Sequence, residues 1–294
     1  MPEPRSTGLT GFDAQNDFMR ARRHAVAAQL AARLRGEPDD VRMVLPYEEV
    51  IEALGFVSEH RVGLLVVPLD AIVGSVDRGR DFDRSFRPTS GRVRSRWEHI
   101  AAAVRRGESL PPVDLVRIGA IYFVRDGHHR VSVARALGRT DIDAYVTEVV
   151  TRVGAEKTIT LADLPLKSLE RVFFERVPLP DHARHEIEVD DPWDFARLAE
   201  AVEAWGFRTT QDRGEPMNRR ETAFQWLEVE YRPVVAMLRQ ADLIGARTET
   251  EAYLSVSAER YRLLRTHRWD EEVIARLTAG GARRARRRRA ASSS

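Results

Sequence analysis

The chain has 294 residues, of which 43% are hydrophobic and 31% are charged, a composition typical of a globular protein. No apolar run approaches the roughly 18 residues of a membrane span, and the first residues lack the apolar segment of a signal peptide. We therefore expect a cytoplasmic protein with no membrane partner. The absence of cysteine excludes disulfides, thiolate zinc sites and thiol catalysis.

The formal net charge of +2 is unevenly distributed, because an arginine-rich tail at residues 280–294 carries much of the positive charge. Its six arginines are Arg283, Arg284, Arg286, Arg287, Arg288 and Arg289. Without them, acidic side chains outnumber basic ones in the rest of the chain. We expect the tail to be disordered and either to bind a polyanion such as DNA or to act only as a solubilising segment.

Residues 1–60 predict an N-terminal helical segment. Within residues 13–35, small apolar residues and Phe18 recur on one side and arginines on the other, which is typical of an amphipathic helix. Residues 45–55 predict a second, shorter helix with a proline near its first turn and a glycine just past its end. Both helices are expected to pack on the domain that follows.

Residues 61–150 predict an α+β domain of mixed sheet and helices. The expected elements are a strand followed by a turn at 62–73, a charged loop at 74–94, a helix at 97–107, a hairpin at 116–126, a helix at 128–138 and a strand at 141–150. The turn Asp126-Gly127-His128-His129-Arg130 stands between the hairpin and the second helix. A helix N-terminus favours anions, and Arg130 adds a planar cationic fork suited to phosphate oxygens. The sequence therefore predicts a phosphate site at this turn.

The order of these elements, with Leu110-Pro111-Pro112 before the hairpin and a glycine-x-x-arginine turn after it, resembles the ParB N-terminal and sulfiredoxin-like superfamily. The resemblance covers residues 61–150 and includes ParB-like nuclease-domain and chromosome-partitioning proteins. It implies a nucleotide cofactor, which is CTP in ParB proteins, ATP in sulfiredoxins and ADP in free-serine kinases. Matched residue by residue, it implies that Gly127, His128, His129, Arg130 and Arg80 bind the nucleotide.

Catalytic residues are predicted at the same turn and in the charged loop before it. His128 and Asp126 are candidates for proton transfer, and Asp81 is the candidate carboxylate base, with Asp77 and Asp83 as the other loop carboxylates. Asp126 either orients a histidine, binds Mg²⁺ together with phosphate oxygens, or caps the helix. No metal site is predicted for the protein itself, because adjacent histidines do not both face one ion.

Residues 151–279 predict a mainly helical C-terminal domain. Residues 158–166 are expected to connect the two domains, and residues 177–191 to form a loop. Apolar residues at helical spacing predict helices at 193–205, 219–241 and 250–266, and Pro233 is expected to kink or divide the second of them.

Two function classes follow from these observations. The first is a nucleotide-dependent switch, phosphohydrolase or phosphotransferase that holds phosphate at the Gly127 turn. The second is a DNA-associated nuclease or adaptor that binds through Arg283 to Arg289, with a homodimer as a possible assembly in either class. The residues alone do not choose the nucleotide, the base or the acceptor.

Overall fold

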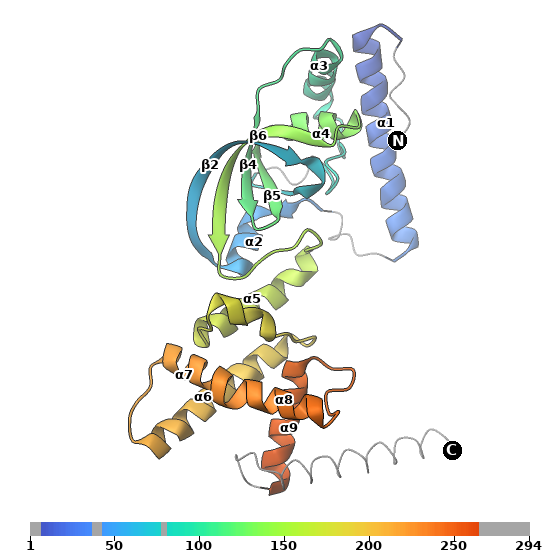
Figure 1. Ribbon diagram of the computed structural model, residues 1–294. Helices are drawn as coiled ribbons and strands as arrows, with labels where there is room; N and C mark the ends of the chain where they lie inside the picture. The colour runs from blue at the N-terminus through green and yellow to red at the C-terminus, as the bar shows by residue number, and fades with distance from the viewer. Residues whose placement is uncertain (1–6, 37–42, 78–80, 265–294) are drawn as a thin grey trace, which may run out of the picture. The chain divides into compact units, whose positions relative to one another are not determined.

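A computed structural model describes residues 7–36, 43–77 and 81–264 of the protein (Figure 1). The helices are α1 (Thr10–Leu34), α2 (Tyr47–Leu54), α3 (Arg94–Arg105), α4 (His128–Ala136), α5 (Leu164–Arg176), α6 (Trp193–Arg213), α7 (Arg219–Trp226), α8 (Arg232–Gln240) and α9 (Glu249–Leu264). The strands are β1 (Leu45–Pro46), β2 (Phe56–Pro68), β3 (Ile72–Ser75), β4 (Val113–Ile118), β5 (Ile121–Asp126) and β6 (Asp141–Thr151). Among these helices, none is long and apolar enough to cross a membrane.

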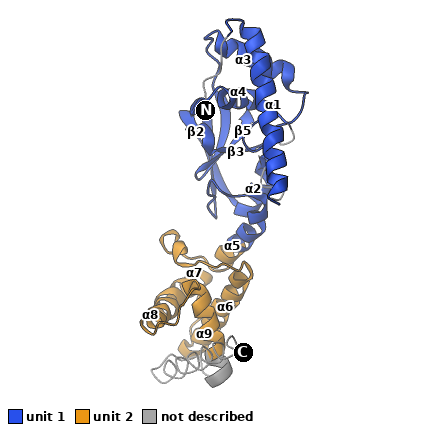
Figure 2. Ribbon diagram, turned by 90° about the vertical axis from the view of Figure 1, so that its right-hand side faces the viewer, with its two compact units in different colours: residues 1–171 blue, residues 172–294 orange. Residues whose placement is uncertain are grey.

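The chain divides into two compact units, residues 1–171 and residues 172–294 (Figure 2). This division differs from the expected boundaries at residues 60 and 150. The first expected boundary falls inside β2, because residues 45–60 contribute strands to the same sheet as the central domain. The second is replaced by a boundary within α5, which begins in unit 1. The predicted tail at 280–294 lies outside the described residues.

Unit 1 contains a six-stranded mixed sheet in the order β1-β3-β5-β4-β6-β2. The β1–β3, β3–β5 and β4–β6 pairs are parallel, whereas the β4–β5 and β6–β2 pairs are antiparallel. This arrangement confirms the α+β class. The strand and turn expected at 62–73 are present as the end of β2 and a 3₁₀ turn at Leu69–Ala71. The strand β3, which was not expected, follows the turn and lies at a different place in the sheet from β2.

The main hydrophobic core of unit 1 lies between the sheet and α1, α3 and α4, which gather on one side of it (Figure 1). Trp97 of α3 is fully buried and meets the Phe18 ring of α1 edge to face, with the ring centroids 5.5 Å apart. The indole Nε1 of Trp97 donates to Ser132 Oγ of α4 at 2.8 Å. One tryptophan therefore connects all three helices, and α4 has a fixed position against the sheet.

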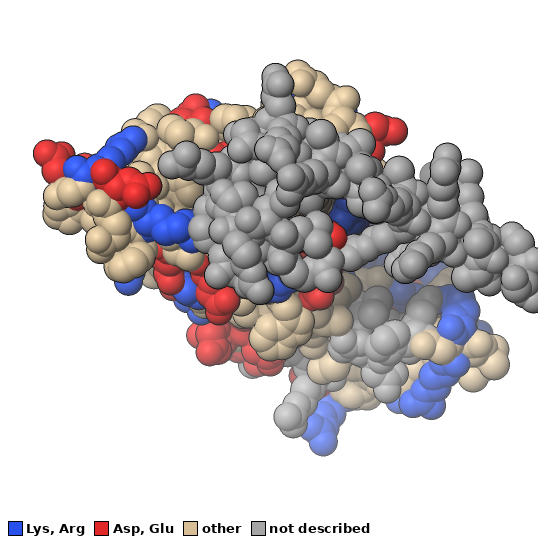
Figure 3. Space-filling model, turned by 90° about the horizontal axis from the view of Figure 1, so that it is seen from below, with Lys and Arg blue, Asp and Glu red and all other residues tan. Residues whose placement is uncertain are grey.

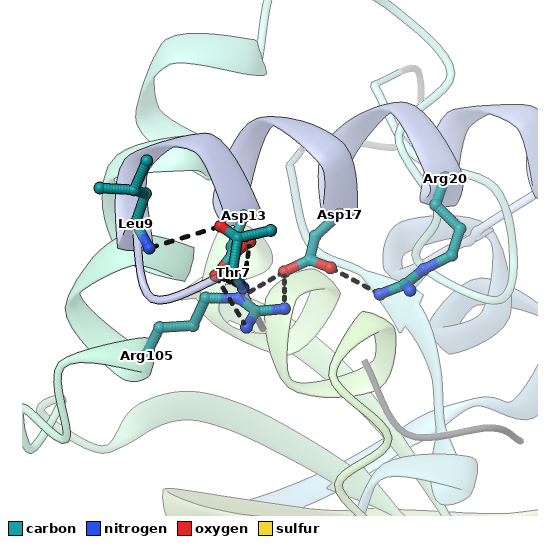
Figure 4. A network of polar contacts seen from close by, with 6 residues as sticks. All are labelled: Thr7, Leu9, Asp13, Asp17, Arg20 and Arg105. Atoms are coloured by element: carbon teal, nitrogen blue, oxygen red, sulfur yellow. Dashed lines mark hydrogen bonds and ion pairs between the residues drawn. The ribbon is translucent and has the colours of Figure 1, made fainter. Parts of the chain in front are cut away.

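Two acidic side chains on the inner face of α1 fasten this helix to the end of α3 (Figure 4). Asp13 and Asp17 are both about 2% exposed. Arg105 Nη2 lies 2.6 Å from Asp17 Oδ2, and its Nη1 lies 3.8 Å from Asp13 Oδ2. Asp13 also accepts hydrogen bonds from Thr7, and Asp17 pairs with Arg20 at 2.5 Å. The charge of each buried carboxylate is thus compensated, as burial requires.

Unit 2 is helical, as predicted for this region. The expected helix at 219–241 is present as α7 and α8, joined without a break by a π-helical turn at Leu227–Tyr231 that ends just before Pro233. A proline lacks the N–H that the preceding turn would need, which explains why the hydrogen-bond pattern changes at this point. The segment expected to connect the domains instead runs into α5, and α6 extends to Arg213 rather than 205.

An aromatic cluster forms part of the core of unit 2, where the Trp226, Tyr231 and Tyr253 rings pack together at centroid distances of 5.0 to 5.9 Å. The Tyr231 hydroxyl donates to the Glu186 carbonyl at 2.9 Å and lies 2.9 Å from Thr250 Oγ1. Burial is the largest cause that raises the pKa of Tyr231 to about 12.

The raised pKa of Tyr231 predicts a loss of stability at alkaline pH. The folded state favours the neutral phenol, so the stabilisation is complete below the ordinary pKa of 10.0 and is lost as the pH rises towards 12. Two pKa units correspond to about 2–3 kcal/mol. Urea unfolding at several pH values should show this loss, and Tyr231→Phe should remove it. Tyr145→Phe, at an exposed position, is the control. An unchanged pH dependence in Tyr231→Phe would contradict the prediction.

Candidate functional site

The turn between β5 and α4 requires glycine. Gly127 has a φ of +101°, a backbone conformation that side chains disfavour, and it occupies the N-cap position of α4. A Cβ atom there would lie 2.6 Å from Val113 Cγ1 and 3.1 Å from Arg130 Cζ. The close approach of β4 to this turn therefore depends on the missing side chain, and Asp126 is not the N-cap residue.

A cavity of about 140 Å³ opens at this turn. Its lining residues come from the segment after β3, from α3, from the end of β5 and from the start of α4: Asp77, Arg96, Ile100, Arg125, Asp126, Gly127, His128, His129 and Arg130. Three arginines and the positive end of the α4 dipole therefore surround a space that also holds two carboxylates. This combination favours an anion over a neutral ligand.

Arg130 connects the turn to the Leu110-Pro111-Pro112 segment. Its Nη1 donates to the Pro111 and Pro112 carbonyls, each at 2.7 Å, and its Nη2 donates to Asp126 Oδ2 at 2.6 Å. Arg130 therefore has a structural role beside the predicted phosphate contact. Asp126 is the partner of this arginine, and its carboxylate remains largely exposed at the cavity.

His128 and His129 are both buried in aromatic surroundings. His128 Nε2 lies 2.7 Å from Ser75 Oγ at the end of β3, and the His128 ring stacks on Phe82 with the centroids 6.4 Å apart. The His129 ring packs edge to face against Phe82, with the ring centroids 5.6 Å apart. The hydrogen bond to Ser75 fixes the orientation of the His128 ring beside the cavity.

Ser75 is a site residue that the sequence did not reveal. It lies at the carboxyl end of β3, which pairs in parallel with β5, so Ser75 is opposite Val124 and close to the turn that follows β5. Parallel strands bring their carboxyl ends to one edge of a sheet. The polar residue after the run Ile72-Val73-Gly74 was the available signal.

The three loop carboxylates have different positions. Asp81 Oδ1 accepts from Ser90 Oγ at 3.2 Å, and Asp83 Oδ1 accepts from the backbone N–H groups of Ser85 and Arg87. Both carboxylates brace the loop, and neither lines the cavity, so the structure does not bring the predicted base Asp81 to the site. Asp77 does line it. The predicted nucleotide-binding Arg80 lies outside the described residues.

A larger cavity of about 560 Å³ lies on the other side of Arg130. Its walls are the segments 107–112 and 138–143 together with Val104 and Ala134. The volume is within the range of roughly 300–1,000 Å³ that is usual for small-molecule sites. Arg130 is common to both cavities, so a ligand with an anionic end at the α4 turn has room beside it for a larger group.

A resident metal site is not apparent in the described part of the chain, where no three histidine, aspartate or glutamate side chains gather to hold an ion. Comparison with known proteins adds no assignment: no family model matches this chain, and no curated protein matches it significantly.

Proposed function

We propose that this protein binds a nucleotide, with its phosphates in the cavity at the Gly127 turn. The observation that carries the proposal is the convergence of Arg96, Arg125 and Arg130 on the positive end of α4. The neighbouring cavity of about 560 Å³ would accommodate the nucleoside, with Arg130 between the two parts. The ParB and sulfiredoxin-like proteins that the sequence resembles hold nucleotide phosphates at the matching turn, which supports the same conclusion.

Each residue at the cavity then has a distinct task. The guanidinium groups of Arg96 and Arg125 would neutralise the phosphate charge, and Arg130 would join the phosphate region to the Pro111-Pro112 wall. The Asp77 and Asp126 carboxylates fit a Mg²⁺ ion, because Mg²⁺ is usually bound by one or two carboxylates plus phosphate oxygens. Such an ion would neutralise charge on the phosphates. His128 would sit beside the phosphates with its ring fixed by Ser75.

The proposed activity is that of a nucleotide-dependent switch or of a phosphohydrolase or phosphotransferase. Transfer to a hydroxyl acceptor needs a carboxylate base near the phosphates, and Asp77 is the loop carboxylate that lines the cavity. We therefore replace Asp81 by Asp77 as the candidate base. Asp77→Asn should abolish turnover if the protein is an enzyme, while nucleotide binding measured without Mg²⁺ should remain.

A nucleotide panel tests the proposal. CTP, ATP, GTP and ADP are added to the full chain with and without Mg²⁺, and the melting temperature, the binding heat and the products are measured. A ligand at one hundred times its Kd stabilises a folded protein by about 2.7 kcal/mol, which gives a clear melting shift. Unchanged melting curves with all four nucleotides at millimolar concentration would refute the proposal.

Arg130→Ala should weaken nucleotide binding about tenfold or more, because a charge-assisted contact contributes on the order of 1.5–3 kcal/mol. It should also lower the melting temperature of the free protein, since three hydrogen bonds to the turn and the proline segment are lost. Calorimetry and thermal melting measure the two effects separately. Undiminished affinity in the folded variant would place the phosphates elsewhere.

Arg96→Ala separates binding from stability. Arg96 is exposed on α3 and lines the same cavity, so its loss should weaken nucleotide binding while leaving the melting temperature of the free protein almost unchanged. Arg92→Ala, an exposed arginine outside the cavity, is the matched control. Equal affinities of the two variants would contradict the role of Arg96.

The second candidate function, a DNA-associated nuclease or adaptor, rests on the six arginines of the tail. Where the described surface is seen in Figure 3, basic and acidic side chains lie side by side at the left of the view, which is not the pattern of a phosphate-binding face. DNA affinity due to the tail should be independent of nucleotide and sequence and should vanish when residues 282–294 are deleted. Affinity that survives the deletion and responds to CTP would instead favour a nucleotide-controlled clamp.

A further inference from the structure

A second cavity lies on the side of α4 that faces α1. It is a cavity of about 260 Å³ between α1, the loop residues 85–87 and the last turns of α4. The residues that define it are Arg20, His24, Phe86, Arg87, Arg135 and Ala136. None of them lines the cavity at the Gly127 turn, so the two sites are separate.

The charged groups around this cavity are basic. Arg20, Arg87, Arg135 and His24 line it, and the lining residues in the described part of the chain include no carboxylate. Asp17 and Asp83 pair with Arg20 and Arg87 from outside the lining. The site therefore presents positive charge inward and favours an anionic ligand.

Arg135 is the least compensated of these cations. Its Nη2 donates to the Leu69 carbonyl and, at 2.8 Å, to the Ile72 carbonyl, so its partners are neutral groups. Its Nε is buried without a hydrogen-bond partner. Burial is the main cause that lowers the pKa of Arg135. Asp83 and Asp70 lie close enough to offset part of this charge, and an anionic ligand in the cavity would offset more of it.

The remaining lining residues are Ser85, Ser132 and three apolar ones, Ala21, Phe86 and Ala136. Phe86 is held at a φ of +55°, a conformation that is rare for a bulky residue, by a turn in which its N–H donates to the Asp83 carbonyl at 2.6 Å. The Arg135 guanidinium lies over the Phe86 ring, 5.4 Å from its centroid. Ala21 and Ala136 complete the apolar part. A cavity of about 150 Å³ already holds a benzene ring, so this one has room for a ring and a carboxylate.

We propose that this cavity binds a small organic acid, a carboxylate carried on an aromatic or branched aliphatic body. The carboxylate pairs with the arginine side chains, where a planar fork matches two oxygens, and the apolar body rests on Phe86 and the two alanines. A phosphate ion alone would leave the apolar wall without a partner, which is why the class is an organic acid.

A ligand in this cavity would also affect the phosphate cavity, because Phe86 contacts His128. The Phe86 ring that forms its wall lies 6.4 Å from the His128 ring, centroid to centroid. A ligand that presses on Phe86 therefore acts on a residue of the Gly127 turn through one aromatic contact. Binding at the organic-acid site itself does not depend on the proposed nucleotide function.

Benzoate tests the proposal, with benzamide as the neutral molecule of the same shape. The histidine ring signals of the full chain are followed by NMR during titration, and the His24 signal is assigned with His24→Gln. We expect benzoate to shift the His24 signal saturably and benzamide to bind at least tenfold more weakly, while exposed His99 stays unchanged. No saturable shift of His24, or equal affinities of the two probes, would overturn the proposal.

Two pairs of variants locate the binding. Ala136→Phe fills the cavity and should abolish benzoate binding, whereas Ala27→Phe at an exposed position of α1 should not. If Ala136→Phe does not fold, Arg20→Gln decides: it should bind benzoate about tenfold more weakly, and Arg22→Gln on the same helix should bind it normally. Binding that survives both cavity variants would refute the site. Retained benzoate binding in Arg96→Ala distinguishes it from the phosphate cavity.

Discussion

Gly127→Ala is expected to destabilise unit 1 by about 2–5 kcal/mol and to abolish nucleotide binding. A non-glycine residue in the left-handed region costs roughly 1–2 kcal/mol. The new methyl group would also lie 2.6 Å from Val113 Cγ1, and forcing extra volume into a packed core costs about 1–3 kcal/mol. Val113 is fully buried in β4, so neither side can move without disturbing the sheet. Urea unfolding and calorimetry with the bound nucleotide measure the two effects.

Gly138→Ala is the matched control for this prediction. Gly138 follows α4 as Gly127 precedes it, and its φ of +77° is also left-handed, but a Cβ there meets nothing within 4 Å. Only the conformational cost of about 1–2 kcal/mol should appear, so the free energy of unfolding should fall by less than in Gly127→Ala. Equal losses of unfolding free energy in the two variants would show that the close contact with β4 is not the reason why residue 127 must be glycine.

Arg105→Ala is expected to destabilise unit 1 by about 3 kcal/mol. The substitution removes the shared partner of two carboxylates that are about 2% exposed, and removing one member of a buried ion pair costs roughly 3–5 kcal/mol. The effect should be near the lower end, because Asp17 keeps Arg20 and Asp13 keeps Thr7. Thermal or urea unfolding measures it, and loss of the α1–α3 contact should accompany the drop.

Arg106→Ala provides the comparison at the neighbouring position. Arg106 pairs with Glu108 at 2.6 Å, a distance as short as that of the buried pair, but both side chains are about half exposed. Water already solvates these charges, so their removal should leave stability almost unchanged. Similar losses in the two variants would mean that burial of Asp13 and Asp17 is not the cause.

The elements that could be predicted are those specified by residues close to one another in the sequence. The hairpin, the glycine turn and α4 follow each other directly in the chain, and apolar periodicity with Gly119 and Gly127 at the turns was sufficient to place them. The N-terminal helix was likewise predicted from its spacing of apolar residues. The turn at Leu69–Ala71 was predicted from the sequence, but the strand β3 after it was missed, because only its pairing with β1 and β5 shows that these four residues form a strand.

The site was predicted in part, and the missing members depend on pairing between distant segments. Gly127, His128, His129 and Arg130 were found because they occur together in the sequence, and they line one cavity. Arg96 and Arg125 line the same cavity from α3 and β5, and Ser75 of β3 contacts His128 beside it. The sequence could not show which of Asp77, Asp81 and Asp83 is the candidate base. The answer depends on the loop conformation, in which Asp81 and Asp83 accept hydrogen bonds from other loop residues.

The position of β2 at the edge of the sheet sets the order in which unit 1 can mature during synthesis. β2 is the first long strand to leave the ribosome, yet its only neighbour in the described sheet is β6, the last strand. At a synthesis rate of about 5–20 residues per second, β6 is made several seconds after β2. During that interval Leu65 and Val67 have no strand to pair with, and the charged run Glu59-His60-Arg61 is what opposes association with other nascent chains.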